Sequence, residues 1–197
     1  MYMNKHSILI LAAGNASRFG SPKQLLPYKD KTFIRRIADE AMTAFGHDIV
    51  VVTGANASLV EAEIPDLTVV RNEAWQDGMG SSVSKGMTTL MNLYPANQDV
   101  IILVCDQPHV SADLLLQIET RRLSTGKGMI ACAYNNTIGT PALFDKRYFS
   151  ELSALNGQQG AKVLLQQYPD DVATVDFPAG DIDIDTAEDY ERLIQSI

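Results

Sequence analysis

Two cations in a glycine-bearing loop are the first residues in this chain that could do chemistry. Arg18 and Lys23 lie in the stretch SILILAAGNASRFGSPK, shortly after the aliphatic run at residues 7–11. A guanidinium group binds polyanions such as a triphosphate as a planar fork, and an ammonium group binds them as a point charge. Gly14 and Gly20 permit turns that a residue with a Cβ resists. The stretch therefore predicts an anion site, and the alternative is an ordinary strand-to-helix turn with solvated cations.

Neither of two common phosphate loops matches this stretch. A Walker loop requires GxxxxGK followed by Ser or Thr, whereas Lys23 here is set back behind Ser21 and Pro22. The dinucleotide fingerprint GxGxxG is absent, and the second predicted strand has no terminal acid for a ribose. Small residues at Ala12 and Ala13 let a ligand approach the backbone at the carboxyl end of the first strand, where open α/β sheets bind ligands.

A carboxylate follows the most strand-like run in the chain. Residues 100–104 read VIILV, and Asp106 comes two residues later. An acid at the end of a central buried strand is unfavourable without a cation, and a hydrated Mg²⁺ held by one or two carboxylates is the common solution beside phosphates. We therefore expect Asp106 to hold Mg²⁺. The alternative is that it caps the helix near Ser111 or forms an Asx turn.

Three further acids alternate with isoleucine near the end of the chain. Asp181, Asp183 and Asp185 share one face of an extended segment, so their charges repel unless a cation is near. Thr186 and Asp189 resemble a capping box for a terminal helix. Solvated acids beside a helix cap are the alternative to a cation site.

A second glycine-rich loop precedes a predicted helix. Residues 72–82 read NEAWQDGMGSS, and an amphipathic helix is expected over residues 83–93. Backbone amides of Gly80, Ser81 and Ser82 at the start of that helix could bind an anion or a base edge. A plain Ser cap on a glycine turn is the alternative.

Strands and helices alternate along the chain. Strands are expected at residues 7–11, 49–52, 67–70, 100–104, 129–133 and 172–176, with helices at 32–44, 58–64, 83–93 and 111–122 and a hairpin after residue 134. Such alternation predicts an α/β fold with three layers, Rossmann-like, in which a mostly parallel central sheet has helices on both faces. The length of 197 residues and the hydrophobic content of 46% indicate a single domain over residues 1–197.

Composition excludes several classes of protein. The net charge of −8 argues against a nucleic-acid partner, which requires a basic stripe. No apolar run approaches the roughly 18 residues of a membrane span, and no leader segment is visible, so we expect a soluble, cytoplasmic protein with no membrane partner. Cys105 and Cys132 lie in apolar runs and are expected to be buried reduced thiols.

The pattern LAAGxxSRFGxPKQLLP, followed by GMGSS, DQP and DIDT, resembles a known family. It is similar to the molybdenum cofactor cytidylyl- and guanylyltransferases and, more broadly, to the sugar-nucleotide and diphosphocytidyl-methylerythritol enzymes of the NTP transferase superfamily. The resemblance implies a Mg²⁺-dependent enzyme that moves NMP, with CMP preferred, from CTP or GTP to a phosphorylated acceptor and releases pyrophosphate. Molybdopterin is the first acceptor it implies. A sugar phosphate, methylerythritol phosphate or a non-catalytic nucleotide-binding module is the alternative.

The resemblance also implies roles for individual residues. Asp106 and Asp185 hold the metal, with Asp183 in reserve, and the catalytic set is Arg18, Lys23 and Asp106. The nucleotide-binding residues are Leu11, Ala12, Ala13, Gly14, Lys23, Thr53, Gly54, Gly78, Met79, Ser81, Ser82 and Asp106.

Two departures from the family pattern leave the acceptor open. Thr140 stands where relatives have His or Asn, and Gln158 stands where they have an acid. The partners implied are the nucleotide, the acceptor and a molybdoenzyme or a chaperone, and the oligomeric state is open.

Overall fold

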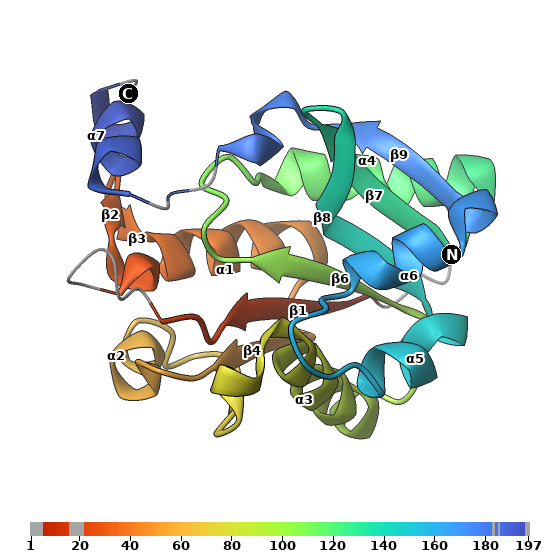
Figure 1. The fold of residues 1–197 in the computed structure, drawn as a ribbon, viewed down its shortest axis with the longest axis horizontal. Coiled ribbons are helices and arrows are strands. Elements are labelled where there is room, and N and C mark those ends of the chain that lie inside the picture. The colour runs from red at the N-terminus through yellow and green to blue at the C-terminus, as the bar shows by residue number, and fades with distance from the viewer. Residues whose placement is uncertain (1–5, 16–21, 183, 185, 196–197) are drawn as a thin grey trace.

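A seven-stranded sheet lies at the centre of the fold in this computed structural model (Figure 1). The structure describes residues 6–15, 22–182, 184 and 186–195. In spatial order the strands are β5 (Thr68–Arg71), β4 (Ile49–Thr53), β1 (His6–Ala12), β6 (Asp99–Val104), β8 (Thr137–Asp145), β7 (Met129–Tyr134) and β9 (Val172–Asp176). Each pairing is parallel except the two made by β8. The predicted mostly parallel sheet is confirmed.

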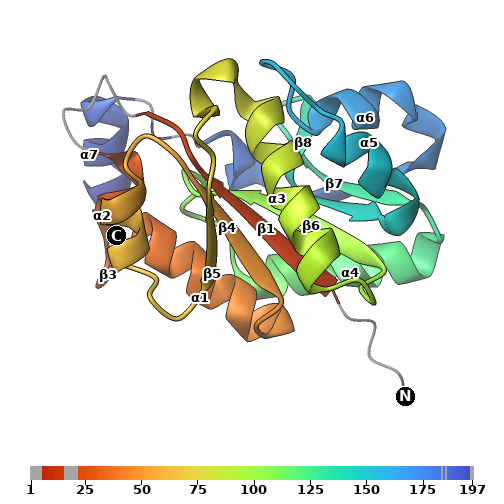
Figure 2. The same cartoon turned by 90° about the horizontal axis from the view of Figure 1, so that it is seen from below.

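Helices cover both faces of this sheet and complete the three layers. Figure 2 shows α3 in front of the sheet and α1 behind it. The helices are α1 (Phe33–Phe45), α2 (Ala57–Ala62), α3 (Met79–Leu93), α4 (Ala112–Thr125), α5 (Phe149–Ser153), α6 (Lys162–Gln167) and α7 (Ala187–Gln195). In the ranges that the structure describes, no helix is both long enough and apolar enough to cross a membrane.

The side chains of β1 alternate between two buried layers. Ile8 and Ile10 pack with apolar residues of α1 and α4, whereas Leu9 and Leu11 pack with those of α3, α5 and α6. All seven residues of β1 are buried, as the continuous apolar run predicts for a strand covered on both faces. This rigid strand fixes the position of the loop at its carboxyl end.

The helix after the second glycine-rich loop begins earlier than the sequence predicts. α3 starts at Met79 instead of residue 83, so Ser81 and Ser82 lie inside its first turns and do not cap it. The N-cap position is Gly78, with φ +116°, so no side chain caps the start of this helix. The alternative of a plain Ser cap is therefore excluded, and the Ser81 and Ser82 hydroxyls instead accept hydrogen bonds from the Asn72 side chain, at 2.8 and 3.0 Å.

The terminal helix packs on a small antiparallel hairpin formed by β2 (Pro27–Tyr28) and β3 (Lys31–Thr32) (Figure 1). Ile184, fully buried, belongs to the same apolar cluster as Leu26, and the Tyr190 hydroxyl donates to the Pro27 carbonyl at 2.5 Å. Thr186 and Asp189 form the expected reciprocal cap, since the Asp189 N–H donates to Thr186 Oγ1 at 3.2 Å. Ile184 is thereby held against the segment that begins at Leu26.

A buried ionic network closes the opposite edge of the sheet, at the amino ends of β1 and β6. His6 Nδ1 bonds to Asp99 Oδ1 at 2.6 Å, and His6 Nε2 bonds to Glu119 Oε1 of α4 at 2.9 Å. Burial by itself lowers the pKa of His6, but the hydrogen bonds and charges of the two carboxylates outweigh it and raise that pKa above the ordinary 6.5. The imidazolium therefore links two strands and a helix.

This network predicts that the protein loses stability as the pH rises. Because the folded-state pKa of His6 is raised, its contribution is complete below pH 6.5 and disappears as the pH rises through the folded-state pKa. Each pKa unit by which the folded state exceeds the unfolded state adds about 1.4 kcal/mol to the free energy of unfolding. Urea unfolding between pH 5.5 and 9 measures this slope, and His6→Gln should flatten it. An equally steep slope in His6→Gln would contradict the assignment.

Candidate functional site

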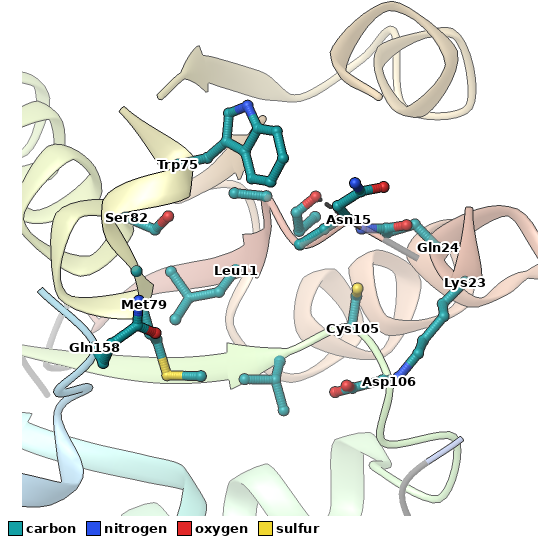
Figure 3. A pocket seen from close by; sticks show the side chains of 15 residues that line it. Leu11, Asn15, Lys23, Gln24, Trp75, Met79, Ser82, Cys105, Asp106 and Gln158 are labelled. Atoms are coloured by element: carbon teal, nitrogen blue, oxygen red, sulfur yellow. Dashed lines mark hydrogen bonds between the residues drawn. The ribbon is translucent and has the colours of Figure 1, made fainter. Parts of the chain in front are cut away.

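A cavity of about 350 Å³ opens at the carboxyl ends of β1 and β6 (Figure 3). This is the edge of a parallel sheet at which the sequence places a ligand. Of the expected site residues, those on the cavity wall are Leu11, Ala12, Ala13, Gly14, Lys23, Gly78, Met79, Ser82 and Asp106. Residues from three distant stretches of the chain therefore share one concave surface.

Lys23 and Asp106 lie on the same side of this cavity. Lys23 opens the 3₁₀ turn Lys23–Leu25, directly after Pro22, and Asp106 follows β6. Figure 3 shows the two side chains directed toward one another. Both charges also act on the neighbouring Cys105 thiol, whose pKa is raised by burial and by Asp106 and lowered in part by Lys23. The net effect is a raised pKa, so Cys105 remains a neutral thiol and is unsuited to act as a nucleophile.

Gln24 fixes the loop at the end of β1, a role that the sequence pattern did not reveal. Its side chain is 4% exposed, and its Nε2 donates to the Ala12 carbonyl at 3.1 Å and to the Gly14 carbonyl at 2.8 Å. Both carbonyls are thereby turned toward Gln24. These two bonds brace the backbone of residues 12–14, which line the cavity.

The far wall of the cavity is built from two loops in close contact. The Gly80 N–H donates to the Gly157 carbonyl at 3.0 Å, and a Cβ at Gly80 would lie 2.5 Å from the Asn156 carbonyl oxygen. This contact brings Gln158 onto the wall, beside Met79 (Figure 3). Only glycine at position 80 permits such an approach of two backbones.

Gly80→Ala is expected to reduce the free energy of unfolding by about 1–3 kcal/mol, the range for overpacking a filled site. The obstacle is backbone, which cannot rotate away, so the 156–160 loop must shift and nucleotide binding should weaken with it. Chemical unfolding and calorimetric titration with an NTP measure the two effects. Gly14→Ala is the matched control for stability, because its added Cβ would meet nothing within 4 Å. Equal stability of the two variants would contradict this prediction.

Three of the expected nucleotide-binding residues do not line the cavity. Thr53 is fully buried and donates from its hydroxyl to Glu61 at 3.2 Å. Gly54 lies behind the β1 loop, where a Cβ would be 2.6 Å from the Ala13 carbonyl oxygen. The Ser81 hydroxyl donates to backbone carbonyls of its own loop. These residues support the wall from behind.

Trp75 and Asn15 join the wall although the sequence singled out neither as a site residue. The indole of Trp75 lies across the cavity from Asp106 (Figure 3). A flat aromatic ring beside small residues is suited to stacking with a base. The signal in the sequence was the single Trp of the chain inside a glycine-rich loop.

Arg18, Asp183 and Asp185 lie outside the described residues, so their predicted roles remain predictions. Described residues near the two acids are nonetheless anchored to elements of the site. The buried Gln107 side chain, next to Asp106, donates to the Gly180 carbonyl at 2.9 Å and to the Thr140 carbonyl at 3.1 Å. Together with Ile184 against Leu26, this places the described residues on both sides of Asp183 beside elements of the cavity.

Asp106 fits a partly hydrated divalent cation. It is the single carboxylate among the described residues of the cavity wall. The structure groups no three His, Cys, Asp or Glu side chains into a metal cluster within the ranges it describes. Mg²⁺ keeps several waters and needs only one or two carboxylates beside phosphates, so this donor set suits Mg²⁺ better than a metal that demands a full protein cage.

Comparisons with known proteins find one matching family and several similar proteins. Residues 8–172 match the family described as "MobA-like NTP transferase domain". A protein called nicotine blue oxidoreductase, from Paenarthrobacter nicotinovorans, is 29% identical over 94% of this chain and 95% of its own length. A probable molybdenum cofactor guanylyltransferase from Bacillus mycoides is 31% identical, over 55% of this chain and 52% of its own.

The fold is also similar to that of Rv0371c from Mycobacterium tuberculosis. Its crystal structure has a TM-score of 0.81 and 29% identity, covering 99% of this chain and 100% of that one. A further structure of Rv0371c, described as a complex with manganese, has a TM-score of 0.74 and 28% identity, covering 98% of this chain and 100% of that one.

Proposed function

Because this chain belongs to the family of MobA-like NTP transferase domains, we propose that it transfers a nucleotidyl group from an NTP to a phosphorylated small-molecule acceptor and releases pyrophosphate. The observation that carries the proposal is the convergence of the β1 loop, Lys23 and Asp106 on one cavity. A cation and a carboxylate beside a small-residue loop match what a metal-bound triphosphate requires.

The reaction needs no nucleophile from the protein. An oxygen of the acceptor phosphate attacks the α-phosphorus, and a new P–O bond forms while the bond to the bridging oxygen breaks. The electron pair of that bond leaves with pyrophosphate, whose developing charge Lys23 offsets. Arg18 has the same proposed role. Catalysis then consists of positioning and charge stabilisation, in agreement with a Cys105 thiol kept neutral by its raised pKa.

Asp106 would hold the divalent metal, with Asp185 as the second proposed ligand. We propose Mg²⁺, and the structure of the similar Rv0371c described as a complex with manganese supports a divalent metal here. A cation held by Asp106 would supply positive charge that offsets the negative charge of the phosphates. Asp106 keeps its carboxylate on the cavity wall for this purpose.

The nucleotide would lie along the wall formed by residues 11–14 and the start of α3. Backbone groups of the braced loop read the edge of the base, and Trp75 offers it a stacking surface. CTP is our first choice and GTP the second. Among acceptors molybdopterin is the first choice, because a partial relative is called a molybdenum cofactor guanylyltransferase. A sugar phosphate or methylerythritol phosphate is the alternative.

Oxidoreduction is a second candidate, favoured by the one observation that the relative called nicotine blue oxidoreductase matches nearly the whole chain. The described cysteines do not supply a redox group: burial raises the pKa of the Cys132 thiol to about 12, and Cys105 is likewise buried. This candidate therefore requires a redox group that the described cysteines do not provide.

Pyrophosphate release measured over the four common NTPs, with a panel of phosphorylated acceptors and with or without Mg²⁺, tests the proposal. We expect release only when metal and acceptor are both present. Oxidation of NAD(P)H with electron acceptors, followed at 340 nm, tests the second candidate. Nucleotide binding without turnover in either assay would favour the non-catalytic nucleotide-binding module.

A further inference from the structure

Asn72 directly follows β5 and is 5% exposed. Its Oδ1 accepts a hydrogen bond from the Ala74 N–H at 3.1 Å. Because a backbone N–H can only donate, this bond identifies the side-chain oxygen of Asn72 and leaves Nδ2 as the donor on the other side. Nδ2 donates to the hydroxyl oxygens of Ser81 and Ser82, at 2.8 and 3.0 Å. Toward Asn72, both serine hydroxyls are therefore acceptors.

The two serine hydroxyls use their protons differently. A hydroxyl that accepts a hydrogen bond retains one proton to donate, and Ser81 donates it to the carbonyls of Ala74 and Gly78, at 3.0 and 2.8 Å. The Gly78 carbonyl lies four residues before Ser82, where a helical serine ordinarily donates. That carbonyl also accepts from the Ser81 N–H at 3.2 Å, so its lone pairs are occupied. In the part of the chain that the structure describes, no acceptor takes the Ser82 proton, which is thus available to a ligand.

Ser82 lies on the wall of the cavity, at the end occupied by Trp75. Figure 3 shows it away from Lys23 and Asp106, the residues proposed to act on the triphosphate and its metal. With the phosphates beside Lys23 and Asp106, the base is directed toward Trp75. The Ser82 hydroxyl is therefore positioned to donate to the base and not to the phosphates.

The loop after β1 also offers donors at this end of the cavity. The four carbonyls of residues 11–14 each accept a hydrogen bond from another part of the protein, at 2.8 to 3.4 Å. The donors are the side chain of Gln24 and the N–H groups of Ala55 and Cys105. These carbonyls are turned toward the protein, so the loop presents its N–H groups to a base. The Ser82 hydroxyl adds a side-chain donor to the same wall.

We propose that Asn72 is a positioning residue that holds the Ser82 hydroxyl as a hydrogen-bond donor to the nucleobase. The base atom that faces Ser82 is then an acceptor, a ring nitrogen or a carbonyl oxygen, and not an amino group. An amino group there would face an O–H donor and would lose its bond to water without a replacement. The inference rests on the proposed nucleotide binding. It makes recognition of the base depend on Asn72, a residue that does not itself line the cavity.

Calorimetric titration with two probes tests this inference. The nucleotide probe is α,β-methylene CTP or GTP with Mg²⁺, whichever the wild-type protein binds more tightly. The second probe is inorganic tripolyphosphate with Mg²⁺, which has no base. Asn72→Asp replaces the donating NH₂ group by a carboxylate oxygen, which can only accept, so the Ser82 proton turns away from the cavity. We expect this variant to bind the nucleotide at least tenfold more weakly and tripolyphosphate less than twofold more weakly. Equal losses for the two probes would show a general effect of charge or fold and would overturn the inference.

A double-mutant cycle shows whether Asn72 acts through Ser82. Ser82→Ala alone should weaken nucleotide binding about three- to tenfold, the range of one neutral hydrogen bond. In the Ser82→Ala background, Asn72→Asp should weaken nucleotide binding less than twofold further, because no hydroxyl remains to be turned. The same tenfold loss from Asn72→Asp in both backgrounds would overturn the inference.

Two further variants complete the cycle. Where a thermal melt shows that Asn72→Asp does not fold, Asn72→Ser replaces it, since a hydroxyl still accepts from the Ala74 N–H but the NH₂ group is gone. It should weaken the nucleotide at least threefold, and only when Ser82 is present. Ser84→Ala is the matched control: Ser84 is on the same helix, donates to the Ser153 carbonyl at 2.5 Å and does not line the cavity. It should change neither affinity, and a loss equal to that of Ser82→Ala would contradict the role of Ser82.

The same titrations separate failure of this inference from failure of the proposed function. If the wild-type protein binds neither nucleotide analogue with Mg²⁺, the proposed nucleotidyl transfer is overturned and the inference with it. If it binds nucleotide but the effects of Asn72→Asp and Ser82→Ala are independent, nucleotidyl transfer stands and only the role of Asn72 is overturned.

Discussion

Asp106→Ala is expected to lower kcat for pyrophosphate release by more than about a thousandfold, or about 4 kcal/mol, while the fold is retained. Asp106 is the described carboxylate on the cavity wall, and no other described acid there can hold a cation in its place. Its side chain is half-buried at the end of a strand, so its removal leaves no cavity in the core. Steady-state assays and a thermal melt measure the two parts of this prediction.

Asp176→Ala is the matched control for this variant. Asp176 ends β9 at the same edge of the sheet, but it is exposed and does not line the cavity, so kcat should be unchanged. Asp106→Asn keeps the shape and removes the charge, and it should raise the Mg²⁺ concentration required for half-maximal rate. Normal turnover in Asp106→Ala would remove the metal assignment and leave Asp106 as a structural residue.

Much of the fold could be predicted because its central strands are buried on both faces. The runs that became β1, β4 and β6 are continuously apolar, a pattern that few other structures produce. The start of α3 was misplaced because Ser81 and Ser82 favour capping positions. Their hydroxyls are instead occupied by Asn72, ten residues or fewer away, through a loop conformation that local preference does not specify.

Site residues next to the end of a strand could be predicted from the sequence. Site residues that reach the cavity only through tertiary contacts could not. Asp106 lies two residues after β6, so topology alone brings it to this edge of the sheet. Lys23 opens the 3₁₀ turn Lys23–Leu25, eleven residues after the end of β1, and lines the same cavity. Gln158 reaches the cavity only because Gly80 lets the 156–160 loop approach its backbone. Gln24 acts through two loop carbonyls, a contact that no spacing rule contains.

Lys23→Ala should reduce kcat/KM for the NTP by about 10²–10³-fold, which is about 3–4 kcal/mol of transition-state stabilisation. Negative charge on the pyrophosphate grows as the bond to the α-phosphorus breaks, so a cation beside it acts more strongly in the transition state than in the bound substrate. The loss should therefore appear mainly in kcat, with a smaller change in nucleotide affinity. Steady-state kinetics together with calorimetric NTP binding separate the two quantities.

Because pyrophosphate is the proposed leaving group, the role of Lys23 can also be tested by pyrophosphate binding. If Lys23 acts on pyrophosphate, the variant should also bind free pyrophosphate more weakly, so product inhibition by pyrophosphate should require a higher concentration. Lys23→Arg keeps the charge and should recover part of the rate, since a guanidinium also binds phosphate oxygens. Lys85→Ala, on the exposed side of α3, removes a cation of the same kind away from the cavity and should change neither quantity. An unchanged kcat/KM in Lys23→Ala would contradict the role of Lys23, and equal losses in Lys85→Ala would indicate a general effect of charge on an acidic protein.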